Sequence, residues 1–416
     1  MNSADLDRIG AWLVERGLAG ASETELVHGF CARCNDAGLD FSRAVVIIDT
    51  LHPTLEGRAV RWRNDGLEEK AFVEYGRTEG DAAASWQRNA MNYMVTHGLT
   101  ELRQRLTDEP LPDLEPYATL KRNGYTDFLG LVPRFGGSGS LGEMDCLYSM
   151  WSTRQAGGFS EADLAALRRL VPMLAMAIKC ISMGRIAGTL VEVYLGRDAG
   201  QRVLSGRIRR GVAERIGAVL WYSDLRGYTG IADTAPAGEI IPLLNDYADL
   251  VVSSVTASGG DVLKLIGDGV LAIFAADAAD PAAACRSALK AEAAVRQGLA
   301  KLNARRAAAG HPVTSVYLGL HVGEVFYGNI GSEQRLDFTV VGQAVNEVNR
   351  VASMCRSADR TMLVSAEFAQ AAPEPERSTL VSVGRYALRG VGRAQELFTL
   401  DPGLIPGAAA PSTPPR

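Results

Sequence analysis

Two aspartates in the C-terminal half stand where carboxylates can hold a divalent cation. Asp224 follows an apolar, strand-like run at residues 218–222 and precedes a loop that contains glycine. An aspartate at a strand end, before a loop whose backbone amides can face a phosphate, predicts a metal and triphosphate site. Asp268, followed by Gly269, separates two apolar runs of the segment 259–274, which is a strong hairpin signal. Taken singly, either aspartate could serve only a strand end or a turn.

Three further side chains of this half could bind a base, a sugar or a phosphate. Lys264 lies among apolar neighbours at alternate strand positions, and a lysine on a mostly buried strand needs a partner or a ligand. Asn346 and Arg350 are four residues apart on a helix predicted after a strand at 338–341, so they share one helix face. Arg350 could hold phosphate oxygens and Asn346 could orient a sugar, although both could also be solvated helix residues.

The order and spacing of these segments resemble those of class III adenylate and guanylate cyclases. The resemblance covers nearly the whole second half of the chain and implies a ferredoxin-like α/β sheet at residues 214–401. It also implies an adenylate cyclase, which converts ATP to 3′,5′-cyclic AMP and pyrophosphate. The segments that carry it are WYSDLRGYT (221–229), GGDVLKLIGDGVLAIF (259–274), GLHVGEVFYGNIGS (319–332) and RLDFTVVGQAVNEVNRVASM (335–354).

The resemblance implies a site with two divalent metal ions, Mg²⁺ or Mn²⁺. Asp224 and Asp268 match the two aspartates that bind both ions, and Leu225 lends a backbone carbonyl. One ion would lower the pKa of the ribose 3′ hydroxyl, which attacks the α-phosphorus in line, and the other would neutralise the triphosphate. Further substrate contacts are expected from the loop that follows, at Arg226, Gly227, Tyr228 and Thr229.

The resemblance also assigns the nucleoside contacts. Lys264 and Thr339 match the pair that reads adenine, and Asn346 and Arg350 match the pair that orients the ribose and stabilises the transition state. Guanylate cyclases typically carry Glu and Cys-type residues at the positions of Lys264 and Thr339, so the resemblance favours ATP over GTP as the substrate. A hydroxyl both donates and accepts, so threonine is a less stringent reader than the aspartate of many adenylate cyclases. Whether bicarbonate stimulates, as in Thr-containing relatives, stays open.

Two alternatives to an adenylate cyclase are a guanylate cyclase and an inactive cyclase-like module that serves regulation or dimerisation. The inactive module is disfavoured because all six residues that match the metal, adenine and ribose positions are present, namely Asp224, Asp268, Lys264, Thr339, Asn346 and Arg350. The chain departs from the family pattern at Tyr317, where many relatives have arginine, and at Val391, where some have a triphosphate-binding lysine. Arg389 or Arg393 could substitute for that lysine.

The family pairs two such domains head to tail, and each site takes metal ligands from one domain and purine readers from the other. This chain carries one set of each, so the resemblance implies a homodimer with two equivalent sites.

The N-terminal half, residues 1–182, alternates helix and strand patterns. Strands are predicted at 43–50, 128–132 and 146–151, and Ser160 is a plausible N-cap for a long final helix with Asp163 in its first turn. The pattern of strand, GGFS turn and long helix resembles a GAF domain, which often binds a small molecule or dimerises. A PAS domain or a private sensory fold is the alternative, and the regulator, a small molecule or a protein, is not identified.

Residues 183–213 are predicted to form a helical linker, which could couple the two halves or act only as a spacer. Its helical spacing is carried by Ile186, Leu190, Val193 and Tyr194. Residues 402–416 are rich in Pro, Ala and Gly and are predicted to be disordered.

Composition restricts the partners and the compartment. The formal charge of −5 and the absence of a basic tract argue against nucleic-acid binding. The N-terminus lacks signal-peptide features, and the most apolar helical stretch, residues 170–183, holds Lys179 and predicts no membrane span. A cytoplasmic protein with reduced cysteines is therefore expected. The Cys31/Cys34 pair is interpreted as two half-buried helix residues, and the scattered histidines His28, His52 and His97 do not favour haem.

Overall fold

The computed structural model describes residues 1–76, 85–136, 144–277, 280–388, 394–401 and 403. It divides into two compact units, an N-terminal unit (Met1–Leu190) and a C-terminal unit (Val191–Arg416). The predicted positions Arg389, Val391 and Arg393, and all but residue 403 of the predicted tail, lie outside the described residues.

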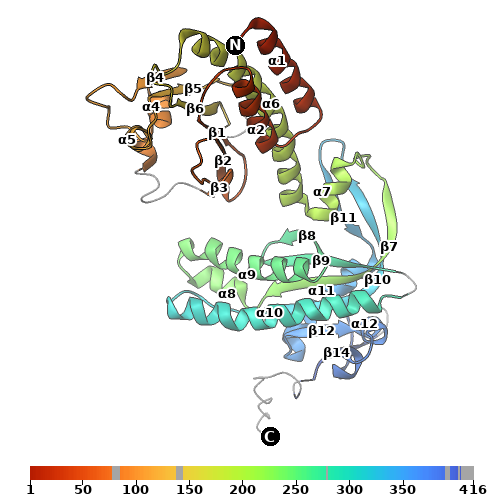
Figure 1. The fold of residues 1–416 in the computed structure, drawn as a ribbon. Coiled ribbons are helices and arrows are strands. Elements are labelled where there is room, and N and C mark those ends of the chain that lie inside the picture. The colour runs from red at the N-terminus through yellow and green to blue at the C-terminus, as the bar shows by residue number, and fades with distance from the viewer. Residues whose placement is uncertain (77–84, 137–143, 278–279, 389–393, 402, 404–416) are drawn as a thin grey trace. The chain divides into compact units, whose positions relative to one another are not determined.

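The N-terminal unit is built on a six-stranded antiparallel sheet with the strand order β3-β2-β1-β6-β5-β4 (Figure 1). Three helices pack on one face, where Phe30 and Trp151 join Leu170 in the core, and two short helices pack on the other face over Phe128 and Met150. The elements are α1 (Ser3–Leu18), α2 (Glu23–Asp36), β1 (Arg43–Asp49), β2 (Leu55–Arg63), β3 (Phe72–Gly76), α4 (Ala90–Thr96), β4 (Glu101–Arg105), α5 (Tyr117–Arg122), β5 (Asp127–Leu131), β6 (Leu147–Thr153) and α6 (Glu161–Leu195).

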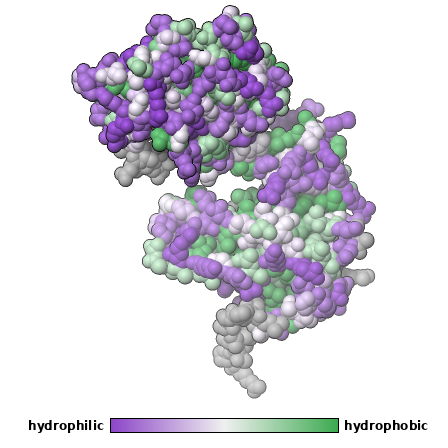
Figure 2. Space-filling view, in the orientation of Figure 1, coloured by the Kyte–Doolittle hydropathy of each residue, from purple (hydrophilic) through white to green (hydrophobic). Residues whose placement is uncertain are grey.

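Local sequence signals explain where the helices of this unit begin. Ser160 accepts a hydrogen bond from the backbone N–H of Asp163 and donates its hydroxyl to the Asp163 carboxylate, so the predicted N-cap of α6 is confirmed. Ser22 and Glu25 form the same reciprocal cap at α2. Cys31 and Cys34 lie on a helix as predicted, but both are fully buried on α2 rather than half-buried. In the view of Figure 2, the surface of this unit is mostly hydrophilic.

Helix α6 is longer than the sequence pattern predicted. Its 35 residues continue through Pro172 and past the predicted stretch, and its most apolar 18-residue window has a mean hydropathy of 1.5. Among the described residues it alone is long and apolar enough to cross a membrane, which corrects the expectation that no segment would qualify. Since 44% of that window is buried inside the protein, much of its apolar character already serves the core.

The region predicted as a helical linker is not one continuous helix. Helix α6 ends at Leu195, and Gly196, with φ of +86°, separates it from α7 (Arg197–Leu204). A Cβ on Gly196 would lie 2.6 Å from the backbone oxygen of Val262, so the turn also needs glycine for close packing. The first strand of the sheet in the C-terminal unit begins at Ala213.

The C-terminal unit is a mixed α/β fold, as expected. Its sheet has the order β13-β14-β12-β10-β7-β9-β8, and β11 pairs with β10 outside this path. Helices α9 and α10 lie side by side over one face, and α11 packs on β10 from the other (Figure 1). The elements are α7, β7 (Ala213–Leu225), α8 (Tyr228–Thr234), α9 (Ala237–Ala257), β8 (Asp261–Ile266), β9 (Gly269–Ala276), α10 (Ala282–Ala308), β10 (Val316–Gly331), β11 (Leu336–Val341), α11 (Gln343–Ala358), β12 (Met362–Ser365), α12 (Ala366–Ala371), η1 (Glu376–Thr379), β13 (Leu380–Tyr386) and β14 (Gln395–Leu400).

Candidate active site

The β8–β9 hairpin places one aspartate beside the end of β7. Strands β7 and β9 are antiparallel neighbours, with Ser223 opposite Val270, so the turn of the hairpin lies next to Asp224. The predicted turn is confirmed but shifted by one residue: Gly267 and Asp268 form it, and Gly269 is already the first residue of β9. Gly267 has φ of +63°, a conformation that favours glycine.

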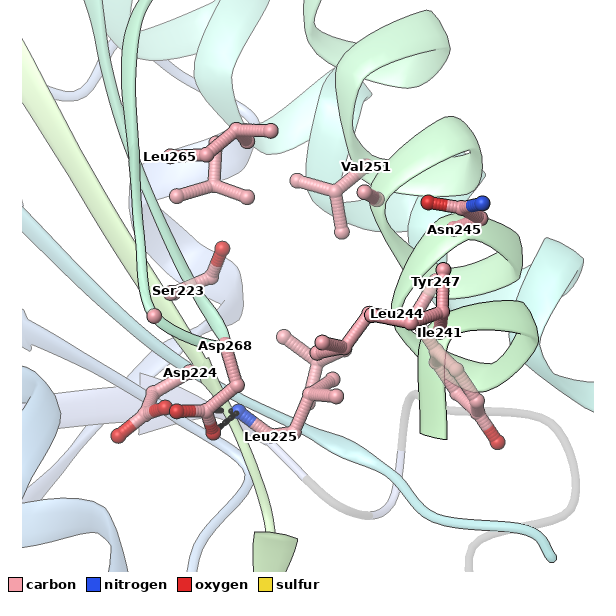
Figure 3. Close-up of a pocket in the computed structure, with 15 residues that line it drawn as sticks. Ser223, Asp224, Leu225, Ile241, Leu244, Asn245, Tyr247, Val251, Leu265 and Asp268 are labelled. Atoms are coloured by element: carbon pink, nitrogen blue, oxygen red, sulfur yellow. Dashed lines mark hydrogen bonds between the residues drawn. The ribbon is translucent and has the colours of Figure 1, made fainter. Parts of the chain in front are cut away.

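Asp224 and Asp268 meet at a single backbone amide (Figure 3). The N–H of Leu225 is 3.0 Å from Asp224 Oδ1 and 3.3 Å from Asp268 Oδ2, so one donor serves both carboxylates. Burial, followed by the neighbouring Asp268, raises the pKa of Asp224 to about 7. Two carboxylates this close repel each other when both are ionised, and a divalent cation bound between them would remove that repulsion.

The donor set of this site suits a hard cation. It consists of the carboxylate oxygens of Asp224 and Asp268, which are ligands that Mg²⁺ and Mn²⁺ prefer. Within the described parts of the chain, no three His, Cys, Asp or Glu side chains are grouped as a metal site. Asp224 and Asp268 would therefore leave coordination positions open to water or to nucleotide phosphates.

A cavity of about 200 Å³ adjoins the two aspartates. Its wall is largely apolar and comes from α9, with Leu244 and Val251, and from Leu265 of the hairpin (Figure 3). Ile241 and Leu265 at this wall are 62% and 58% exposed, which is high for such side chains. We did not single out α9 from the sequence, although the apolar spacing of residues 241–251 would have indicated a helix with one apolar face.

The two predicted adenine-reading residues lie on neighbouring parts of the sheet. Lys264 of β8 forms an ion pair with Asp337 of β11, and both side chains are about 40% exposed. Thr339 lies two residues further along β11, opposite Gly328 of β10, so it points to the same side of the strand as Asp337. The expectation that Lys264 needs a partner is confirmed, and that partner, Asp337, is a residue the sequence reasoning missed.

The other two predicted catalytic residues are on α11, which follows β11 after Gly342. Asn346 is exposed and Arg350 is half-buried. Neither residue lines the cavity beside Asp224, and the same holds for Lys264 and Thr339. One chain thus presents two separate groups of predicted site residues. The first group is Asp224, Asp268 and Leu225, and the second is Lys264 of β8, Thr339 of β11 and Asn346 and Arg350 of α11.

The loop after β7 is held by backbone hydrogen bonds. Arg226 donates its N–H to the carbonyl of Ser315 (2.8 Å), and its guanidinium lies over the ring of Tyr317 at 5.8 Å from the centroid. A cation therefore lies next to the position where arginine was expected. Gly227 has φ of +69°, and Tyr228 and Thr229 begin the short helix α8.

Comparisons with known proteins address the C-terminal unit. Residues 213–401 match the family model described as the adenylate and guanylate cyclase catalytic domain. An adenylate cyclase of Anabaena cylindrica is 30% identical over 177 residues, 42% of this chain and 34% of that protein. An uncharacterized protein of Mycobacterium tuberculosis is 32% identical over 197 residues, 47% of this chain and 35% of that protein.

Solved structures similar to this chain include the adenylyl cyclase CyaB from P. aeruginosa, at 23% identity and a TM-score of 0.41, covering 46% of this chain and 96% of that one. The guanylyl cyclase Cya2 gives 25% identity and a TM-score of 0.40, with 45% and 93% covered. The chain spans about a third of the length of the curated relatives named above. Residues 213–401, somewhat less than half of this chain, thus match the family of adenylate and guanylate cyclase catalytic domains.

Proposed function

We propose that this protein is an adenylate cyclase that forms 3′,5′-cyclic AMP and pyrophosphate from ATP in a head-to-tail homodimer. The observation that carries the proposal is the meeting of Asp224 and Asp268 at the amide of Leu225. Two ionised carboxylates held side by side, partly buried, are favourable only when a cation is bound. Bound Mg²⁺ or Mn²⁺ ions would supply Lewis-acid activation of the ribose 3′ hydroxyl and neutralise phosphate charge.

The residues of the chain have distinct tasks in this mechanism. Asp224 and Asp268 hold the ions with the Leu225 carbonyl. Arg350 neutralises the charge that develops on the α-phosphoryl group, and Asn346 orients the ribose for in-line attack. The backbone of the loop 226–229 and the guanidinium of Arg226 are placed to contact the triphosphate, next to Tyr317.

The need for two chains is supported by the separation of the two groups of residues. The carboxylates adjoin the α9 cavity, whereas Lys264 pairs with β11, and Asn346 and Arg350 lie on α11. A complete site forms when the carboxylates of one protomer face the β11 and α11 set of its partner. Cyclic symmetry then produces two equivalent sites.

The choice of ATP is supported by Lys264 and Thr339. The ammonium of Lys264 can donate to adenine N1, and the hydroxyl of Thr339 can accept from the exocyclic amine. Guanine presents a donor at N1, so the contact of the Lys264 ammonium there would be lost, whereas the Thr339 hydroxyl could still donate to the oxygen at the six position. The 30% identical adenylate cyclase of Anabaena cylindrica adds weak support, since it covers only part of each protein.

For the N-terminal unit we propose a GAF-like regulatory role and a cytoplasmic location. An antiparallel sheet covered by helices on both faces supports the GAF-like assignment. The continuity of α6 from this unit to Leu195 provides a physical connection to the catalytic unit. Six free cysteines support a reducing compartment. Its regulator, a small molecule or a protein, is unidentified.

The deciding experiment incubates the purified protein of residues 1–416 with ATP and Mn²⁺, and in parallel with GTP and Mn²⁺, and identifies the products by chromatography. Cyclic AMP as the main product supports the proposal, and cyclic GMP would identify a guanylate cyclase. If a folded, dimeric protein forms neither cyclic AMP nor cyclic GMP, with Mn²⁺ and in a repeat with Mg²⁺, the result would favour the inactive cyclase-like module.

A further inference from the structure

A buried histidine connects three elements of the catalytic unit. His321 of β10 is 3% exposed, and its two ring nitrogens have different partners. Nδ1 lies 2.9 Å from the hydroxyl oxygen of Ser365, and Nε2 lies 3.0 Å from Glu347 Oε2. Burial lowers the pKa of His321, against the opposing effect of Glu347 and Glu367, so the ring is neutral at neutral pH. A neutral ring with its proton on Nε2 donates to Glu347 and accepts from the Ser365 hydroxyl.

Both ends of this hydrogen-bond network are anchored. The Ser365 oxygen also accepts the backbone N–H of Phe368 (3.2 Å) and so caps α12. Glu347 Oε1 accepts from the side-chain amide of Gln343 (2.8 Å) in the first turn of α11. Glu367 of α12 lies 3.7 Å from Nδ1 and is the second carboxylate that faces the ring. The network therefore runs from α12 through His321 to α11, with every polar atom of the relay satisfied.

The order Ser365, His321, Glu347 is that of a nucleophile, a base and an acid, but the site cannot act as a hydrolase. Ser365 is fully buried, and its oxygen already serves as the N-cap of α12. A substrate carbonyl cannot reach it. The network must act on the protein itself.

The element that the network holds is the one that carries two catalytic residues. Glu347 is buried on α11, with Asn346 next to it and Arg350 three residues further, less than one turn away. The helix packs directly against the backbone of β10: a Cβ on Gly319 would lie 2.6 Å from the backbone nitrogen of Ala352. Apolar packing fixes the distance of such a helix, whereas a directional buried hydrogen bond also fixes its rotation about its own axis.

We propose that His321 is a positioning residue for cyclisation, which holds Glu347 and thereby sets the rotation of α11 and the directions of Asn346 and Arg350. The inference rests on the proposed function. A misplacement of about 1 Å in a positioned group can cost on the order of 100-fold in rate, so a small rotation of α11 is enough to matter.

The test compares two substitutions that each keep one of the two contacts. In His321→Gln the amide nitrogen reaches toward the position of Nε2, so the bond to Glu347 survives. In His321→Asn the shorter amide reaches only the position of Nδ1, so the contact with Ser365 is kept and the hydrogen bond to Glu347 is lost. We expect His321→Gln to keep kcat for ATP with Mn²⁺ within roughly threefold of wild type, and His321→Asn to lower kcat by roughly tenfold or more with little change in KM.

Two further measurements separate positioning from general destabilisation. Thr399→Val is the matched control, because this buried hydroxyl donates to the carbonyl of Met362 (2.7 Å) and is not part of the hydrogen-bond network of His321. It should lower the melting temperature and leave kcat unchanged. Glu347→Gln should lower kcat as His321→Asn does, and the double variant should be no worse than either single one.

Mixing of chains then assigns the defect to one half of the site. His321→Asn chains should regain activity when mixed with Asp224→Ala chains and should not when mixed with Arg350→Ala chains. Equal kcat in His321→Gln and His321→Asn, or wild-type kcat in both His321→Asn and Glu347→Gln, would overturn the inference. If His321→Asn does not fold, Glu347→Gln and His321→Gln decide the same question. A wild-type protein that makes no cyclic nucleotide would instead refute the proposed function.

Discussion

Mixing two inactive chains is the strongest test of the shared site. Asp224→Ala removes a carboxylate of the metal group, and Arg350→Ala removes the cation on α11, while each leaves the other group intact. In a heterodimer, one site combines both defects, and the other combines the wild-type carboxylates of one protomer with the wild-type α11 of its partner. Because Asp224 and Arg350 do not share a cavity within one chain, the two defects are expected to be separable in this way.

The magnitude follows from counting sites. Equal amounts of the two chains at random exchange give about one half heterodimers, and each heterodimer has one working site of two, so the mixture should reach about one quarter of wild-type activity per chain. The assay measures cyclic AMP after mixing and incubation, with exchange followed by fluorescence energy transfer between labelled chains. Exchange that is complete by this measure, with activity still at the level of the parents, would refute the head-to-tail arrangement.

Four other expectations follow from the structure. Asp224→Asn and Asp268→Asn should each abolish turnover while the protein stays folded by circular dichroism. The pKa of Asp224 is raised above its value in the unfolded chain, so ionisation of this carboxyl opposes folding. Metal-free wild type should therefore lose stability relative to Asp224→Asn as the pH rises through about 7. The pKa of His321 is lowered, so the dependence of folding stability on pH has the opposite sign. Wild type should lose stability relative to His321→Gln as the pH falls below about 6.5, the pKa of a histidine in the unfolded chain. Thermal melts across that pH range measure the difference. Changing Lys264 to Glu together with Thr339 to Cys should reduce ATP use and raise relative GTP use, at roughly 1–3 kcal/mol for each polar group left unpaired; an unchanged ratio of kcat/KM values for the two nucleotides would show that other residues read the base. A fragment that begins near Arg207 should differ in specific activity from the full chain when both are dimeric by light scattering, if α6 sets the catalytic geometry, and equal activity would limit the N-terminal unit to another role.

The positions of Asp224 at a strand end and of Asp268 in a hairpin turn were predictable because both have strong local signals. The hairpin around Asp268 depends on a glycine with positive φ, and β7 is marked by an apolar run that ends at Asp224. The strands at 43–49, 127–131 and 147–153 were found within one or two residues for the same reason, since buried strands have continuous apolar runs.

What the sequence could not predict depends on contacts between distant segments. The partner of Lys264 is Asp337, 73 residues away, and nothing local to either residue indicates the pairing. His321 appeared only as part of a family segment, and its role depends on α11 and α12 meeting β10 in space. The continuity of α6 was not predicted, because the sequence analysis divided this run between a final helix of residues 1–182 and a helical linker from residue 183, whereas the structure has one helix from Glu161 to Leu195.

In the proposed homodimer, the division of each site between two chains has a consequence for control. Within a protomer, α11 is held to β10 by buried hydrogen bonds and close packing, and the two aspartates are held by a hairpin turn, so neither group can move far alone. What can change is the relative placement of the two catalytic units in the proposed dimer. A regulator therefore need not touch the carboxylates or the purine readers, because a change in how the two copies of α6 enter the dimer would alter the fit of both sites together. Such a regulator can act only to the extent that it binds one placement more tightly than another, which makes its differential affinity the quantity to measure.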